Sequence, residues 1–413
     1  MRDAGPDAAL LRSARLAFDN DPPARIGLAV SGGGDSMAAL HLMAQVFGPA
    51  LRAVTVDHRL RPEAAEEARF VAGVCAGLGL PHEVLVWDHG AISGNLQDQA
   101  RRARYGLMSD WARRQGICAL VLAHTADDQA ETLLMGLARG AGIDGLAGMR
   151  PNWAEGNLRW HRPFLAHTRQ ELRDYLQRHG LHWRDDPSNE NDRFTRVKAR
   201  RAIRALAPLG LTAERLAQVA GHLAQARQAL DHAVDEALAW HGHEVAGAIS
   251  LDRAGLMELP SEVARRLLVA VLRGIGGAGH PPRGADLDRV QAAIAQGRAA
   301  TLAGCRLLHK GDRLWLCREG RAVAGLTAPS DAPWDRRWSL IGPHAPGLEI
   351  RALGAEGLAL CPDWRALSLP RAVLLATPAI WHQGRLIAAP LAGKPERWQA
   401  ICPPLSAACN IAH

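Results

Sequence analysis

The sequence predicts an α/β protein: a doubly wound parallel sheet, then a helical second domain and a small α+β C-terminal domain. Two observations predict the sheet. Short, nearly continuous apolar stretches alternate with helical stretches up to residue 150, a pattern typical of parallel strands covered on both faces. In addition, a glycine-rich turn, SGGGDS, joins the first apolar stretch directly to an apolar helical pattern.

The first part of the chain is expected to hold four strands and four helices. The strands are predicted at 26–30, 51–56, 82–87 and 118–123, and the helices at 36–47, 62–78, 95–115 and 127–139. In doubly wound sheets, ligands bind beyond the carboxyl ends of the strands, where the strand order reverses. We therefore expect a binding site among the residues that follow the first, second and fourth strands.

Helical and then mixed patterns follow. In chain order, the sequence predicts a helix, a loop and a basic helix over 168–206, an amphipathic helix over 212–240, a helical region over 261–297, a hairpin over 301–319 around Lys310-Gly311-Asp312, a linker over 320–338 and short strands in LEIRAL, AVLLAT and RLIAAP. Pro208 and Gly210 mark a boundary. The predicted domains are residues 1–210, 211–325 and 326–413.

The composition describes a globular protein able to bury a sizeable core, with 413 residues, 48% hydrophobic and 22% charged. Its net charge of +7 is compatible with a polyanionic partner. The seven cysteines are scattered and never form C-x-x-C, which disfavours a disulfide framework or a zinc knuckle. No apolar run is long enough for a membrane span, and residues 1–25 lack a signal-peptide core. We expect a cytoplasmic protein with no membrane partner.

The string Ser31-Gly32-Gly33-Gly34-Asp35-Ser36 is a candidate phosphate-binding loop. Glycines allow a tight turn and let backbone amides approach an anion. Ser36 is expected to cap the following helix, whose free N–H groups and dipole favour a phosphate. A Walker loop needs a lysine that is missing here. The pattern instead resembles the PP-loop of the ATP pyrophosphatase superfamily, which grips the pyrophosphate that leaves when ATP adenylates a substrate.

Acidic residues follow two of the other strands. Asp57, beside His58, could face a ribose hydroxyl, or it could belong to a solvated loop. Asp128 and Glu131 are three residues apart and share one helical face. This pair suits Mg²⁺ or an amine substrate, whereas capping of the helix by Asp127 with acidic residues complementing the dipole is the alternative.

Two further segments are candidates for substrate contact. Arg101 and Arg104 lie on one helical face and could hold triphosphate oxygens, although a solvated basic face would look the same. The segment 137–149, LARGAGIDGLAGM, has no periodicity and carries four glycines within nine residues. Such a composition favours a loop that faces substrate.

Taken in order, these motifs resemble the tRNA(Ile)-lysidine synthase family over residues 25–205. The run is SGGGDS, VDHRLR, NLQDQARRARY, HTADDQAET, LARGAGIDGLAGM, RPFL, TRQELRDYL and DDPSN, followed by Arg196 and Arg200. The resemblance implies a Rossmann-like PP-loop fold and an AMP-forming ligase. ATP adenylates the C2 oxygen of the wobble cytidine in the CAU anticodon of tRNA(Ile), pyrophosphate leaves, and the amine of free L-lysine displaces AMP. The modified tRNA then reads AUA and is charged with isoleucine.

The resemblance also implies roles for individual residues. Those expected to bind ATP are Ser31, Gly32, Gly33, Gly34, Asp35, Ser36, Asp57, His58, Arg101, Arg104 and His124. Those expected to take part in catalysis are Asp35, Asp128, Glu131, Arg196 and Arg200, with Asp35 and Asp128 also expected to bind Mg²⁺. Val197 stands where the family usually has Asn, so any role of that amide is missing.

Other functions remain open at this point. A tRNA-thiolation enzyme normally needs cysteines to carry sulfur or an iron–sulfur cluster, and a ligase similar to GMP synthetase or argininosuccinate synthase would lack the RGAGIDGLAGM block. A catalytically inactive RNA-binding module would not need Asp35, Asp128 and Glu131. A monomer and a homodimer are both open. Basic residues after 212 are expected to contact the tRNA backbone; they are Arg215, Arg227, Arg265, Arg266, Arg273, Arg306, Lys310 and Arg313.

Overall fold

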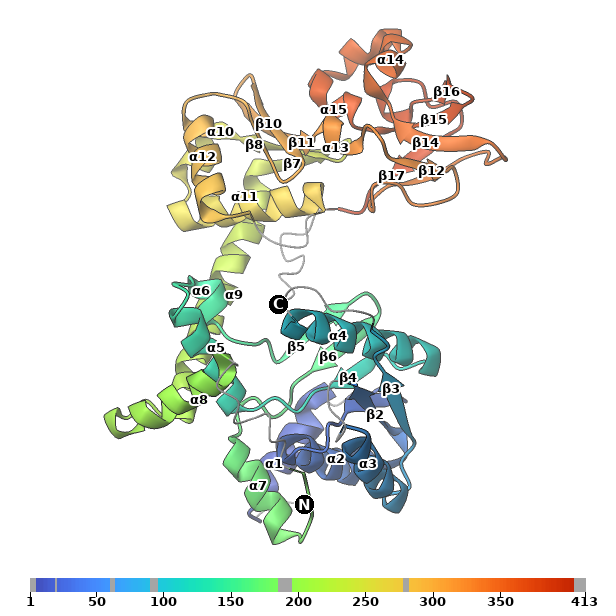
Figure 1. Ribbon diagram of the computed structural model, residues 1–413. Coiled ribbons are helices and arrows are strands. Elements are labelled where there is room, and N and C mark those ends of the chain that lie inside the picture. The colour runs from blue at the N-terminus through green and yellow to red at the C-terminus, as the bar shows by residue number, and fades with distance from the viewer. Residues whose placement is uncertain are drawn as a thin grey trace. The chain divides into compact units, whose positions relative to one another are not determined.

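The structure, a computed structural model, describes residues 5–18, 21–59, 64–89, 96–184, 195–277 and 282–404. The chain forms two compact units, Met1–Arg227 and Gln228–Ile411, and the boundary between them falls inside the long helix α9 (Ala213–His241) (Figure 1). Each unit has its own sheets and its own core, and each is described separately below.

Unit 1 is built around a six-stranded sheet in the order β3-β2-β1-β4-β6-β5. Its strands are β1 (Ile26–Ala29), β2 (Leu51–Asp57), β3 (His82–Val86), β4 (Ala119–Val121), β5 (Asn152–Glu155) and β6 (Leu158–His161). All neighbouring strands are parallel except β5, which pairs antiparallel with β6. The order reverses between β1 and β4, so the switch point lies at the end of the strand that leads into SGGGDS.

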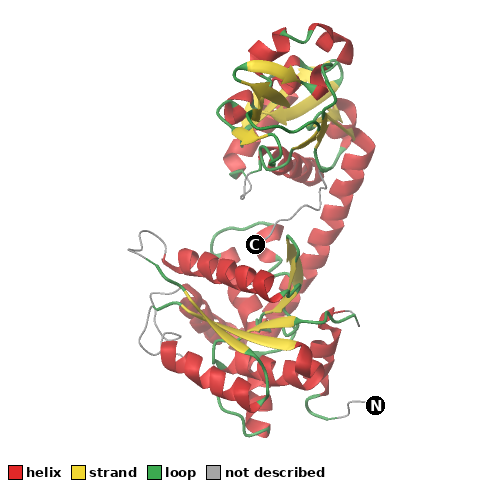
Figure 2. Ribbon diagram, turned by 90° about the vertical axis from the view of Figure 1, so that its right-hand side faces the viewer, coloured by secondary structure: helices red, strands yellow, loops and turns green. Residues whose placement is uncertain are grey.

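Helices cover both faces of this sheet (Figure 2). Neighbouring residues of one strand point to opposite faces, so Leu28 packs in one core cluster and Ala29 in another. The first cluster includes residues of α1 (Ala8–Arg15), α2 (Gly34–Phe47), α3 (Ala64–Gly77) and α7 (Arg169–Arg178), and the second is covered by α4 (Leu96–Gln115). The prediction of an α/β protein with a doubly wound sheet is confirmed.

Three shorter helices complete unit 1 before α9. They are α5 (Ala126–Leu137), α6 (Ile143–Leu146) and α8 (Thr195–Leu206). Each of the four predicted strands and helices of the first 140 residues is present with bounds that differ by a few residues. The sequence prediction missed α1 and the β5–β6 hairpin. The hairpin escaped notice because its two strands are only four residues long and one of them, β5, is largely exposed.

Unit 2 begins with a five-stranded antiparallel sheet in the order β7-β8-β11-β10-β9. The strands are β7 (Gly242–Val245), β8 (Ala248–Asp252), β9 (Ala300–Leu302), β10 (Cys305–Lys310) and β11 (Arg313–Arg318), and the helices are α10 (Arg253–Glu258), α11 (Ser261–Gly276) and α12 (Gly284–Ala295). The predicted hairpin is confirmed as β10–β11. The expected helical region therefore also holds a sheet.

The end of unit 2 is a four-stranded sheet, β12-β14-β15-β16, beside the pair β13-β17. Its strands are β12 (Thr327–Pro329), β13 (Ser339–Ile341), β14 (Leu348–Ala352), β15 (Pro378–His382), β16 (Arg385–Ala388) and β17 (Gln399–Ile401), and its helices are α13 (Gly320–Val323), α14 (Gly354–Ala359) and α15 (Arg371–Leu375). The expected strands in LEIRAL and RLIAAP are confirmed as β14 and β16.

Two predictions in this region are wrong. The expected linker at 320–338 is part of the fold, because β12 pairs with β14 and the rings of Trp334 and Trp338 are 1% and 2% exposed. The expected strand in AVLLAT is the helix α15, which begins after Pro370. Within the described residues, no helix is both long enough and apolar enough to cross a membrane.

Candidate active site

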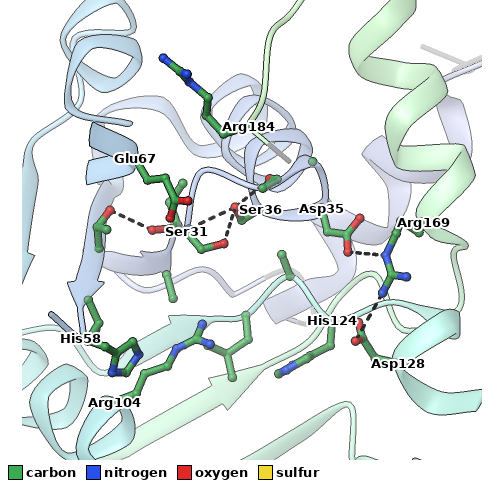
Figure 3. Close-up of a pocket in the computed structure, with 18 of the residues that line it drawn as sticks. Ser31, Asp35, Ser36, His58, Glu67, Arg104, His124, Asp128, Arg169 and Arg184 are labelled. Atoms are coloured by element: carbon green, nitrogen blue, oxygen red, sulfur yellow. Dashed lines mark hydrogen bonds and ion pairs between the residues drawn. The ribbon is translucent and has the colours of Figure 1, made fainter. Parts of the chain in front are cut away.

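A cavity of about 950 Å³ opens at the carboxyl ends of β1, β2 and β4, where the switch point of the sheet lies (Figure 3). Its described lining contains seven arginines against three acidic residues. The arginines are Arg104, Arg169, Arg173, Arg184, Arg196, Arg200 and Arg204, and the acids are Asp35, Glu67 and Asp128. Such an excess of fixed positive charge suits a polyanion such as a triphosphate.

Backbone groups of the SGGGDS loop form hydrogen bonds with one hydroxyl group, that of Ser36. Ser36 Oγ accepts a hydrogen bond from the Ser31 amide at 3.1 Å and donates to the Gly33 carbonyl at 2.9 Å. Gly32 has a φ of +88°, a conformation that favours glycine. The expected cap by Ser36 is wrong, because α2 begins at Gly34, its N-cap is Gly33, and no side chain caps it. The first amides of α2 therefore remain available to an anion.

Arg169, the first residue of α7, lies among four carboxylates, of which Figure 3 shows Asp35 and Asp128. Its Nε is 3.0 Å from Asp35 Oδ2, and its terminal nitrogens are 4.0 Å from Asp127, 3.6 Å from Asp128 and 3.6 Å from Glu131. The Arg169 backbone amide also donates to Asp127 Oδ2 at 2.7 Å. This guanidinium group thus holds together acidic residues from α2 and α5.

Two of these carboxylates hold their protons more tightly than usual. Burial raises the pKa of Asp35 to about 6, with Arg169 opposing the rise and Asp128 adding to it. Burial and then the Asp128 charge raise the pKa of Glu131, against the hydrogen bond that it accepts from Arg200 at 2.5 Å. Asp35 Oδ1 and Glu131 Oε2 are buried and accept no hydrogen bond from the described residues. Both oxygens are therefore suited to receive a cation or a proton.

The two carboxylate oxygens of Asp128 have different surroundings: Oδ2 stabilises the start of α5, and Oδ1 faces Arg169. Its Oδ2 accepts hydrogen bonds from the Thr125 amide at 2.9 Å and the Thr125 hydroxyl at 3.1 Å, which closes a capping box at the start of α5. Its Oδ1 points toward Arg169. The expected capping by Asp127 is therefore wrong, because Asp128 closes the capping box with Thr125, and Asp128 Oδ1 remains directed at Arg169.

His124 follows β4 and lines the same cavity. Its Nδ1 accepts a hydrogen bond from Arg162 Nε at 3.0 Å. Burial lowers the pKa of His124 far below its usual value; Arg162 and Arg104 lower it further, whereas Asp128 acts in the opposite direction. The ring is therefore uncharged near neutral pH.

Comparison with known proteins assigns this site to a family. Residues 7–206 match the model of the PP-loop domain. The tRNA(Ile)-lysidine synthase of Ruegeria pomeroyi is 49% identical over 95% of this chain and 94% of its own length. The chain belongs to the tRNA(Ile)-lysidine synthase family. The synthases of Zymomonas mobilis and Methylobacterium nodulans are 39% and 43% identical, over 70% and 72% of this chain and 87% and 91% of their own.

The structure brings together most of the residues expected from the lysidine synthase motifs. Those that line the cavity are Ser31, Gly33, Gly34, Asp35, Ser36, His58, Arg104, His124, Asp128, Arg196 and Arg200. Glu131 lies behind this lining, 1% exposed, in contact with Arg169 and Arg200. The DDPSN segment, Asn95 and part of VDHRLR lie outside the described residues.

Four expectations do not match the cavity. Gly32 shapes the loop without lining the cavity, and Asp57 accepts a hydrogen bond from the Arg59 amide at 2.8 Å. Arg101 lies over the ring of Tyr105, 5.2 Å from its centroid. No residue of the glycine-rich segment 137–149 is among the described lining residues. Two of its four glycines serve close packing, because a Cβ would lie 2.7 Å from the Cβ of Ala141 on Gly145 and 2.5 Å from Gln129 Oε1 on Gly148.

Sequence reasoning missed several functional candidates of this lysidine synthase relative, above all Arg169. The segment TRQEL did carry a signal. Thr168 and Glu171 form a capping box, which fixes Arg169 as the first helical residue. A cation at that position is disfavoured by the helix dipole, so an arginine there needs another reason. Arg173, Arg184, Arg204 and Glu67 had no comparable local signal.

Proposed function

We propose that this protein joins free L-lysine to C2 of the wobble cytidine in the CAU anticodon of tRNA(Ile), with ATP converted to AMP and pyrophosphate. The observation that carries the proposal is the arginine-rich cavity in which the SGGGDS loop faces the Asp128 carboxylate. The family membership of the chain supports the same reaction. Cytosine is a poor electrophile at C2, and adenylation of its oxygen creates the leaving group that the reaction needs.

The first step is the attack of the cytosine C2 oxygen on the α-phosphorus of ATP, which releases pyrophosphate. Negative charge accumulates on the leaving phosphates, and preorganised donors stabilise it. We assign this role to the uncapped amides of α2 and to the guanidinium groups of Arg104 and Arg196, which line the cavity.

The donor set also suits Mg²⁺, which prefers carboxylate oxygens together with phosphate oxygens and water. Asp35, with a buried Oδ1 that accepts no hydrogen bond, and Asp128 would hold the ion. There it would neutralise charge on the phosphates. Within the described residues, no group of three or more His, Cys, Asp or Glu is arranged as a metal site, which agrees with a site completed by the nucleotide.

In the second step the lysine amine attacks C2, the bond from C2 to the adenylated oxygen breaks, and AMP leaves. The ammonium group must first lose a proton, and we assign Glu131 as the acceptor. Its raised pKa makes the carboxylate a stronger base, and its buried Oε2 accepts no hydrogen bond from the described residues. Arg200 holds the other oxygen and so fixes the orientation of the carboxylate.

The tRNA also needs contacts outside the cavity. Of the basic residues expected to bind it, Arg265 and Arg266 pair with Glu262, and Arg313 donates to Ser250. Arg306 and Lys310 are exposed on β10, and the Lys310 ammonium also donates to the Ser368 carbonyl at 2.7 Å. We assign both residues to contacts with tRNA phosphates. We also propose that the protein is cytoplasmic, because its substrates are found in the cytoplasm.

The test is incubation with ATP, radiolabelled lysine and a transcript of the tRNA(Ile) that carries the CAU anticodon. Label should enter the RNA only when ATP is present, and a transcript with uridine at the wobble position should take up none. Asp35→Ala should nearly abolish pyrophosphate exchange, whereas Asp110→Ala, an exposed carboxylate outside the cavity, should not. Equal labelling of the initiator methionine tRNA would contradict the proposed specificity.

A further inference from the structure

The hydrogen bond between Arg162 and His124 determines where the proton of the imidazole sits. A guanidinium group has only donors, so the ring nitrogen that receives its N–H must present a lone pair. That nitrogen is Nδ1, 3.0 Å from Arg162 Nε. In a neutral imidazole the other nitrogen then carries the hydrogen. His124 is therefore the Nε2–H tautomer.

Arg162 has little freedom to give up this bond. The residue is 2% exposed and follows directly after β6. A terminal nitrogen donates to the Arg150 carbonyl at 2.7 Å, and the guanidinium lies 4.1 Å from the centroid of the Trp153 ring. Trp153 in turn stacks on the fully buried Trp160, with the rings 5.3 Å apart and nearly parallel. Packing, a cation–π contact and a backbone hydrogen bond thus hold Arg162 in place.

The same arrangement keeps the His124 ring uncharged. A second ring proton would have to sit on Nδ1. That N–H and the N–H of Arg162 would then point at each other, and neither would have an acceptor. The second proton would also place a positive ring beside Arg162, Arg104 and Arg196, whose charges oppose that of Asp128, the acidic residue that acts most strongly on the ring. Burial disfavours the charged form as well. The imidazole consequently stays neutral across the range in which histidines usually titrate.

We propose that His124 is a fixed, neutral Nε2–H donor in the cavity, and that Arg162 is the positioning residue that sets its tautomer. Figure 3 shows the His124 ring between Arg104 and Asp128, among the residues that line the cavity. Resting on the proposed function, the inference assigns this N–H to an anionic oxygen of the nucleotide or of the adenylated cytidine. It also removes His124 as the base for lysine, since Nδ1 is occupied and Nε2 is already protonated.

The tautomer can be measured on the free enzyme. In protein labelled with ¹⁵N-histidine, long-range proton–nitrogen correlations should show His124 with a lone pair on Nδ1, unchanged from about pH 5.5 to about 8.5. Signals that disappear in His124→Gln identify the residue. Arg162→Met should allow a second tautomer or a titration, and Arg162→Lys, which keeps a charged donor, should restore the wild-type pattern. Arg159→Met, at an exposed arginine in β6 three residues before Arg162, is the matched control.

A wild-type ring that is protonated on Nδ1, or that titrates in this range, would overturn the assignment. The measurement needs no substrate, so its result is independent of whether the protein makes lysidine.

Activity tests the donor role separately. The side-chain amide of His124→Gln can donate a hydrogen bond but cannot act as a base near neutral pH. It should keep pyrophosphate exchange within roughly tenfold of wild type, whereas His124→Leu should lose ~10²–10³-fold, the usual effect of removing one such donor. Arg162→Met should lower kcat for exchange more than it raises the KM for ATP. Equal losses in His124→Gln and His124→Leu, or a change confined to KM, would refute the donor role.

Discussion

Replacing Asp35 with asparagine is expected to stabilise the ligand-free protein while it removes pyrophosphate exchange. Burial, together with Asp128, raises the pKa of this carboxyl from 3.8 to about 6 despite the contact with Arg169. The folded state therefore holds a proton that the unfolded state has already released. This contribution to stability is complete below pH 3.8 and is lost as the pH rises through about 6.

The size of the effect follows from the same values. Each tenfold change in proton affinity corresponds to ~1.4 kcal/mol. A pKa moved from 3.8 to about 6 therefore makes the ionised side chain cost ~3 kcal/mol of unfolding free energy at neutral pH. The side chain is 22% exposed, so solvent screens this cost only partly. Asparagine has nearly the same shape and no charge, so Asp35→Asn should recover most of that energy above pH 7 and none below pH 4.

The assay is urea unfolding without Mg²⁺ or nucleotide, at about pH 3.5 and about pH 8. Asp110→Asn, at an exposed carboxylate, is the control and should change little at either pH. Stabilisation that is equal at the two pH values would show that the effect is packing. A destabilised variant at about pH 8 would show that Arg169 compensates fully for the buried charge, which would refute the reasoning.

Three further predictions concern other parts of the molecule. Glu131→Gln should lower kcat for lysine incorporation by roughly 10²–10⁴-fold with tRNA affinity unchanged, as steady-state kinetics and filter binding can show; an unchanged kcat would return Glu131 to a structural role. Alanine at both Arg306 and Lys310 should reduce the slope of log tRNA affinity against log salt by roughly one to two, and an unaltered slope would exclude these contacts. Gly148→Ala should cost ~1–3 kcal/mol in urea unfolding, because its Cβ would lie 2.5 Å from Gln129 Oε1 at a φ of +64°; wild-type stability would contradict that packing.

Sequence patterns predicted the parts of the fold that local chemistry determines. SGGGDS needs glycines at fixed positions, and the strand before it is buried throughout, so both could be recognised without a structure. AVLLAT could not, because a short apolar run fits a strand and a helix equally well. The supposed linker at 320–338 was misjudged from its glycines and prolines. Its tryptophans, Trp334 and Trp338, were the better guide, since large aromatic rings pack in cores.

The same distinction between locally encoded features and features that depend on the whole fold applies to the candidate site. Asp35, Asp128 and His124 stand in recognisable strings directly after buried strands, so the sequence placed them at the right edge of the sheet. Arg162 and Arg169 act on these residues from segments 38 and 134 positions away along the chain. No local pattern encodes such distances. They become visible only when the β6 and α7 segments fold against the rest of unit 1.

The Gln129 side chain on α5 hydrogen-bonds both backbone polar groups of Met149, the last residue of the glycine-rich segment, as a neighbouring β-strand would. Its amide donates to the Met149 carbonyl at 3.0 Å and accepts from the Met149 amide at 2.6 Å. These two hydrogen bonds fix the position of Met149 relative to α5, three residues before β5 begins. Gln129 directly follows Asp128 in α5, so the helix turn that presents a carboxylate to the cavity also fixes the end of the glycine-rich segment.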